Sequence, residues 1–142
     1  MKDNDYYMML ALRQAKKCKK SRKYYSVGAI IVKNNKIIGA GYSLKFKDFH
    51  AEECAIKFAK ENPKDATLYT TMEPCSLRLS GKTPCSSIII KKKISKVVFA
   101  AKEPKIFVNC KGIKILKKHK IKTLQLEKYE KMSLRLNNHL LK

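Results

Sequence analysis

A strand–helix–strand unit is predicted by residues 67–101, which read TLYTTMEPCSLRLSGKTPCSSIIIKKKISKVVFAA. Residues 67–72 and 96–101 are rich in the β-branched and aromatic side chains that strands favour. Between them, Pro84 suits the first turn of a helix over 85–92, although its three isoleucines leave a short strand as an alternative. Strands joined through a helix imply a crossover connection within one sheet, so this unit indicates an α/β fold.

The segments on either side extend the same pattern. Apolar residues at helical spacing predict further helices, and two β-branched runs around the turn Asn34-Asn35 predict a hairpin. The expected elements are a helix at 6–20, strands at 27–32 and 36–42, helices at 50–60 and 110–119, a strand at 121–126 and an amphipathic helix at 127–141. Together they predict a three-layer α/β/α sandwich with a five-stranded mixed sheet, in one domain spanning residues 1–142 with its core at about 6–126.

Composition limits the possible classes of protein. A chain of 142 residues with 44% hydrophobic content can build one packed core. No run approaches the roughly 18 apolar residues of a membrane span, and residues 1–5 do not resemble a secretion signal, so we expect a cytoplasmic protein. The five cysteines are an odd number, which favours metal binding by some of them over a disulfide framework.

Three of the potential metal ligands stand where the predicted elements could bring them together. His50 opens the helix at 50–60, Cys75 follows the strand at 67–72, and Cys85 opens the next helix. Three such ligands leave one position of a tetrahedral zinc open for water, as a catalytic site requires. The pattern therefore predicts a zinc site rather than two buried cysteines and a helix-capping histidine.

Glu52 lies two residues after His50, so the first helical turn can place its carboxylate beside water at the metal. A carboxylate there can take a proton from water and deliver it to a substrate nitrogen and then to a departing amine. The expected reaction is a hydrolytic deamination in which Glu52 is the catalytic residue.

These motifs resemble the zinc deaminase signature His-x-Glu followed by Pro-Cys-x-x-Cys, except that nine residues separate Cys75 and Cys85. The wider interval, with the strings at 73–76 and 81–85, resembles the pyrimidine deaminases of riboflavin biosynthesis within the cytidine deaminase-like superfamily, and residues 72–81 look most like the fungal form. The resemblance covers most of residues 6–126. It implies the cytidine deaminase-like fold and a substrate that is a diaminopyrimidinone with a phosphorylated ribosyl or ribityl chain.

The same resemblance suggests where the substrate phosphate could bind and how the chain could assemble. Four basic residues are candidates for the phosphate: Arg78, Lys82, Lys105 and Lys111. No reductase segment follows residue 142, so we expect a stand-alone catalyst. Superfamily members commonly form dimers or tetramers, which makes the apolar face of Met132, Leu136 and Leu140 either a homodimer interface or part of the monomer core.

Two other functions remain open. The net charge of +22, with Tyr24 and Tyr25 next to Arg22 and Lys23, would suit a deaminase of single-stranded DNA or tRNA, although the tyrosines could equally be core residues. Compositional drift toward Lys explains the charge as well, because only four of the 33 basic residues are Arg. A nucleic-acid-binding module with a structural zinc is the third reading, and Glu52 argues against it.

Overall fold

Residues 2–141 are described by the computed structural model, and five of their segments form one mixed sheet. The strands are β1 (Gly28–Lys33), β2 (Lys36–Tyr42), β3 (Thr67–Met72), β4 (Lys96–Ala101) and β5 (Lys122–Gln125). They lie in the order β2-β1-β3-β4-β5. β1 is antiparallel to β2 and β3, whereas β3, β4 and β5 are parallel. The predicted five-stranded mixed sheet is confirmed.

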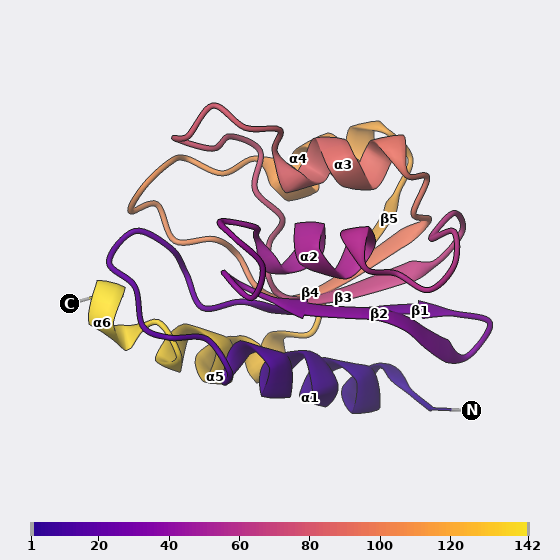
Figure 1. The fold of residues 1–142 in the computed structure, drawn as a ribbon, viewed down its shortest axis with the longest axis horizontal. Helices are drawn as coiled ribbons and strands as arrows, with labels where there is room; N and C mark the ends of the chain where they lie inside the picture. Colours follow the sequence, from indigo (N-terminus) through magenta and orange to yellow (C-terminus); the bar gives the residue numbers. More distant parts are fainter. Residues whose placement is uncertain (1, 142) are drawn as a thin grey trace.

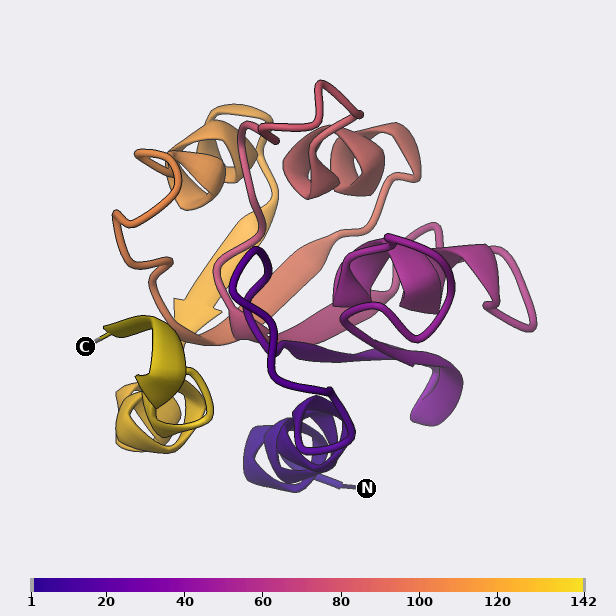
Figure 2. The ribbon, with the colours of Figure 1, turned by 60° about the vertical axis from the view of Figure 1, so that its left-hand side comes forward.

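Helices cover both faces of this sheet (Figure 1). They are α1 (Asn4–Ala15), α2 (Ala51–Lys57), α3 (Cys85–Lys91), α4 (Gly112–Lys118), the 3-10 helix η1 (Glu127–Tyr129), α5 (Glu130–Arg135) and α6 (Asn138–Leu141). Figure 2 shows α2, α3 and α4 on one face, and α1 beside α5 on the other, which is the predicted three-layer α/β/α sandwich. Among residues 2–141, no helix has both the length and the apolar character needed to cross a membrane.

The alternation of side chains along β1 explains why both faces need a cover. Ala29 and Ile31 pack into the cluster beneath α2, whereas Ile30 and Val32 pack into the cluster beneath α1. Successive side chains of a strand point to opposite faces, so a strand that is apolar at every position must be buried on both. The predicted hairpin is also present, because Asn34 and Asn35 have φ values of 51° and 61°, as a type I′ turn requires.

Two predicted helices differ from the structure. The first was expected at 6–20, but α1 begins at Asn4, capped by the Asp3 side chain, and ends at Ala15. Beyond Ala15 the Lys-rich segment offers little apolar surface to pack on the sheet, so the chain leaves the helix there. The helix predicted at 127–141 is divided into η1, α5 and α6. The second break lies at 136–137, where the buried side chain of Asn137 bonds to the backbone of Ser26.

The packing bears on two alternatives that the sequence left open. The isoleucines at 88–90 belong to α3, so their reading as a strand is wrong. Met132 and Leu136 pack against the core cluster beneath α1 and help to close the monomer core.

Three connections gather at one end of the sheet, on the left of Figure 1. They are the α1–β1 loop (16–27), the β3–α3 loop (73–84) and the β4–α4 loop (102–111). The last two leave the carboxyl ends of neighbouring parallel strands, which is where open α/β sheets usually bind ligands. The antiparallel direction of β1 brings the α1–β1 loop to the same end.

Candidate active site

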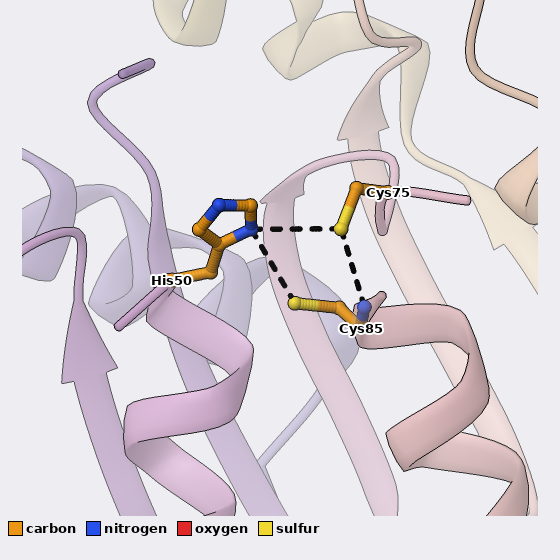
Figure 3. A group of neighbouring side chains, drawn as sticks. All are labelled: His50, Cys75 and Cys85. Atoms are coloured by element: carbon orange, nitrogen blue, oxygen red, sulfur yellow. Dashed lines mark hydrogen bonds between the residues drawn. The ribbon is translucent and has the colours of Figure 1, made fainter. Parts of the chain in front are cut away.

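Three elements bring the predicted metal ligands together. His50 is the residue directly before α2, in extended conformation, Cys75 lies just beyond β3, and Cys85 is the first residue of α3. Their ligand atoms all lie within 4.8 Å of one another. Figure 3 shows the imidazole of His50 directed at both sulfur atoms.

The nitrogen that faces the sulfurs is Nδ1. It lies 3.5 Å from Cys75 Sγ and 3.5 Å from Cys85 Sγ, and the backbone N–H of Cys85 donates to Cys75 Sγ at 3.2 Å. One imidazole and two thiols are ligands that zinc prefers, and three protein ligands leave a tetrahedral position open. The residues present therefore fit a catalytic zinc ion bound through His50 Nδ1, Cys75 Sγ and Cys85 Sγ.

Contact between the two thiols shifts their pKa values in opposite directions. The pKa of Cys75 is lowered to about 4, first because the Cys85 thiol donates to its sulfur and then because His50 lies against it. The pKa of Cys85 is raised above its ordinary value, because its thiol donates to Cys75 and is fully buried. A divalent cation between the sulfurs would favour both as thiolates, which are the metal-binding form.

Glu52 lies in the first turn of α2 and is only 4% exposed. Burial raises its pKa from 4.5 to about 7, and the charge of His50 partly opposes that rise. Such a carboxyl exchanges protons readily near neutral pH. Its side chain lines the same cavity as His50 and Cys75.

That cavity has a volume of about 400 Å³ and opens between the three gathered loops. His50, Glu52 and Cys75 form one part of its wall, and aromatic side chains of the α1–β1 and β4–α4 loops form another. The Tyr24 ring meets the His50 imidazole edge to face, with centroids 6.2 Å apart. Tyr25 packs against Phe107 at 5.1 Å, and its hydroxyl donates to the carbonyl of Pro104.

Arg78 lines the cavity, but its guanidinium is already bound by protein groups. It donates to Glu53 Oε1 at 3.0 Å and to the carbonyls of Thr83 and Asp48, each at 3.3 Å. Glu53 Oε1 also accepts the backbone N–H of His50, at 3.2 Å. Arg78 therefore connects the β3–α3 loop to the start of α2 and supports the position of His50.

The other three residues predicted to bind phosphate lie outside the cavity wall. Lys82 is exposed and forms an ion pair with Asp48. Lys105 and Lys111 are exposed on the β4–α4 loop, and neither is among the residues that line the cavity within the described chain. The structure does not bring these lysines to the metal-ligand group.

The cavity wall also contains charged residues that were not predicted to belong to the site. Glu73 and Glu103 each closely follow a parallel strand, and that position was the available signal. Glu73 accepts the backbone N–H of Glu103 and that of Ile113, both at 3.1 Å. Burial, then the charges of Cys75, Glu52 and Glu73, raise the pKa of Glu103 to about 8. Arg22 and Lys23 also line the cavity.

Comparison with known proteins identifies relatives of this chain. A diaminohydroxyphosphoribosylamino-pyrimidine deaminase of Schizosaccharomyces pombe is 49% identical over 122 residues, which cover 82% of this chain. The chain spans only 30% of that relative's length. The deaminase/reductase of Thermotoga maritima superposes with a TM-score of 0.84 at 29% identity, over 96% of this chain and 40% of that one.

A structure of the Aspergillus oryzae Rib2 deaminase in complex with DARIPP superposes with a TM-score of 0.80 at 26% identity, over 93% of this chain and 88% of that one. These neighbours confirm the predicted cytidine deaminase-like fold. Residues 1–101 match the family described as the zinc-binding region of cytidine and deoxycytidylate deaminases. That match includes His50, Cys75 and Cys85 and covers well over half of the sequence, so the chain belongs to the cytidine and deoxycytidylate deaminase family.

Proposed function

We propose that this chain is a single-domain, zinc-dependent hydrolytic deaminase of a phosphorylated diaminopyrimidinone, an intermediate of riboflavin biosynthesis. One observation carries the proposal: an imidazole and two thiols converge, and the imidazole and one of the thiols line a cavity together with the buried carboxyl of Glu52. The 49% identity to the Schizosaccharomyces pombe deaminase supports the substrate class. The similarity to the Aspergillus oryzae enzyme, which binds DARIPP in its structure, supports it as well.

His50, Cys75 and Cys85 would hold the zinc ion. When bound, zinc supplies a Lewis acid that makes water a stronger nucleophile near neutral pH. Arg78, through Glu53, keeps His50 at the start of α2, and the N–H of Cys85 orients the sulfur of Cys75. These contacts set the positions of the ligands before substrate enters.

Glu52 would move the protons. Deamination adds water across the carbon–nitrogen double bond of the pyrimidine, breaks the bond to the amino group and leaves a carbonyl and ammonia. The carboxylate takes one proton from water and gives it to the ring nitrogen, then transfers the second proton from the new hydroxyl to the departing amine. Its burial beside His50 excludes bulk water, which would compete for those protons.

The test compares the zinc-loaded protein with Glu52→Gln, using the phosphorylated diaminopyrimidinones as substrates and ammonia release as the readout. We expect the variant to keep one zinc per chain and to lose activity by about 10²- to 10⁴-fold, the usual contribution of a general acid–base group. Glu61→Gln, an exposed glutamate beyond α2, is the matched control and should keep full activity.

An unchanged rate in Glu52→Gln would contradict the assigned role, and a wild-type protein without zinc would contradict the whole proposal. Wild type and variant equally inert toward every substrate would favour the non-catalytic binding module. Turnover of oligonucleotides alone would favour the polynucleotide deaminase.

The polynucleotide reading has less support. Tyr25 is built into the cavity wall by its contact with Phe107 and its hydrogen bond to Pro104, and Tyr24 packs on His50, so neither ring is a free platform for stacking bases. We propose a cytoplasmic location, because all five cysteines are free thiols, as a reducing compartment favours. We also propose a homodimer, which light scattering would test.

A further inference from the structure

The cavity of the candidate active site is lined by charges of both signs. The carboxyl groups are those of Glu52, Glu73 and Glu103, and the cations are those of Arg22, Lys23 and Arg78. A phosphorylated substrate needs a cation that is free to bind an anion. The phosphate would therefore bind a cation of the cavity that has no other partner.

The guanidinium of Arg78 is already bound by other groups of the protein. It donates to Glu53 and to two carbonyls, and the Arg78 side chain is only 2% exposed. Of the other basic side chains in the described residues, Lys82 pairs with Asp48 and Lys128 pairs with Asp5. Arg22 and Lys23 take part in no ion pair within residues 2–141, and both are exposed at the cavity.

The backbone around these two cations is held in place. Ser21 Oγ accepts the backbone N–H of Lys23 at 3.0 Å and that of Tyr24 at 3.2 Å, which forms a turn with Arg22 and Lys23 at its tip. Tyr24, the next residue, contacts His50. The turn therefore places its two cations in the wall of the cavity, directly before the residue whose ring contacts His50.

From this arrangement we infer that Arg22 and Lys23 form the subsite for the phosphate of the substrate, while the pyrimidine ring lies at the metal-ligand group. The inference rests on the proposed function. The planar guanidinium of Arg22 can bind a phosphate through two parallel hydrogen bonds, and Lys23 adds a second point charge. Within residues 2–141, the carboxyl groups of the cavity form no ion pair with these two cations, and Glu73 accepts two backbone N–H groups instead.

The experiment uses Arg22→Ala combined with Lys23→Ala in the zinc-loaded full chain, and Lys19→Ala combined with Lys20→Ala as the control. The control lysines are exposed on the same loop but do not line the cavity. We expect the first pair to raise KM for the phosphorylated diaminopyrimidinone by about 10- to 100-fold, from the loss of charged hydrogen bonds, with kcat changed far less. KM for the dephosphorylated compound should stay unchanged, and Arg22→Lys should recover part of the loss.

Direct titration with ribose 5-phosphate separates this inference from the proposed function. Binding that is lost in the Arg22→Ala/Lys23→Ala protein, without any deamination, would keep the subsite and refute the function. Deamination with an unchanged KM in that variant, or an equal rise in KM for both substrates, would refute the subsite and keep the function. A loss of affinity for single-stranded oligonucleotides but not for ribose 5-phosphate would also overturn the subsite.

Discussion

Glu103 is a half-buried carboxyl whose environment disfavours its charge. Its pKa is about 8 in the folded protein against an ordinary value of 4.5, so the folded state binds this proton more tightly than the unfolded chain does. Stability from this group is therefore complete below about pH 4.5 and is lost as the pH rises through about 8. Glu103→Gln keeps the shape of the protonated form and cannot lose a proton.

We expect the melting temperatures of wild type and Glu103→Gln to be similar at pH 5 and the variant to be the more stable at pH 9. Thermal unfolding followed by circular dichroism measures both. Glu127→Gln, at an exposed glutamate, should shift the melting temperature equally at the two pH values. A gap between Glu103→Gln and wild type that stays constant with pH would show that the Glu103 carboxyl is already ionised at pH 5.

Single residues differ in how far the sequence alone could predict their roles. The convergence of His50, Cys75 and Cys85 was predictable, because few roles other than metal binding explain such ligand types at element ends. Arg78 was predicted to bind substrate, yet the structure places its guanidinium between Glu53 and two carbonyls. Partners of that kind depend on loops that meet only in three dimensions, and no local pattern reports them.

At the scale of elements, the close packing of α4 on the loop after β3 depends on Gly112. A Cβ atom at this position would lie 1.7 Å from the carbonyl oxygen of Pro74, the residue before Cys75. The start of α4 thus rests directly on the backbone next to Cys75, one of the three candidate metal ligands. A side chain there must push this backbone away, because a carbonyl cannot move aside as the end of a flexible side chain can.

Gly112→Ala should therefore lower the free energy of unfolding by about 1–3 kcal/mol or more, as overpacking does, and weaken zinc binding through Cys75. Chemical denaturation and competition with a zinc-binding dye measure the two effects. Lys114→Ala, at an exposed position of α4, should change neither. If Gly112→Ala binds zinc as wild type does, Cys75 is held independently of α4.

Elements were predicted best where the hydrophobic periodicity and the turn-forming residues indicate the same boundaries. The hairpin turn at Asn34 and Asn35 and the buried strands follow from local residue types. The division of the C-terminal helix at Asn137 does not follow from local residue types. Its apolar spacing continues through Met132 and Leu136, and the break arises from hydrogen bonds to a loop more than one hundred residues away.

At the scale of the whole molecule, the C-terminal segment meets the α1–β1 loop beside the cavity. Asn137 Oδ1 accepts the backbone N–H of Ser26 at 2.6 Å, and its Nδ2 donates to the carbonyl of Ser26 at 3.2 Å. His139 Nε2 lies 2.9 Å from the carbonyl of Ser21. Residues 21 and 26 flank the turn with Arg22 and Lys23, and this turn lines the cavity. The C-terminal segment, which lies at the same end of the molecule in Figure 1, therefore holds the loop in place.

Asn137→Ala removes this connection and leaves two buried backbone groups of Ser26 without partners. Each such group costs about 1–3 kcal/mol, so we expect the free energy of unfolding to fall by about 2–6 kcal/mol in chemical denaturation. In the fraction that remains folded, the loosened loop should raise KM for the phosphorylated diaminopyrimidinone while zinc stays bound. Asn138→Ala is the control, because it alters the same residue type at the next, exposed position. Equal stability and equal KM in the two variants would mean that the α1–β1 loop keeps its shape without the C-terminal segment.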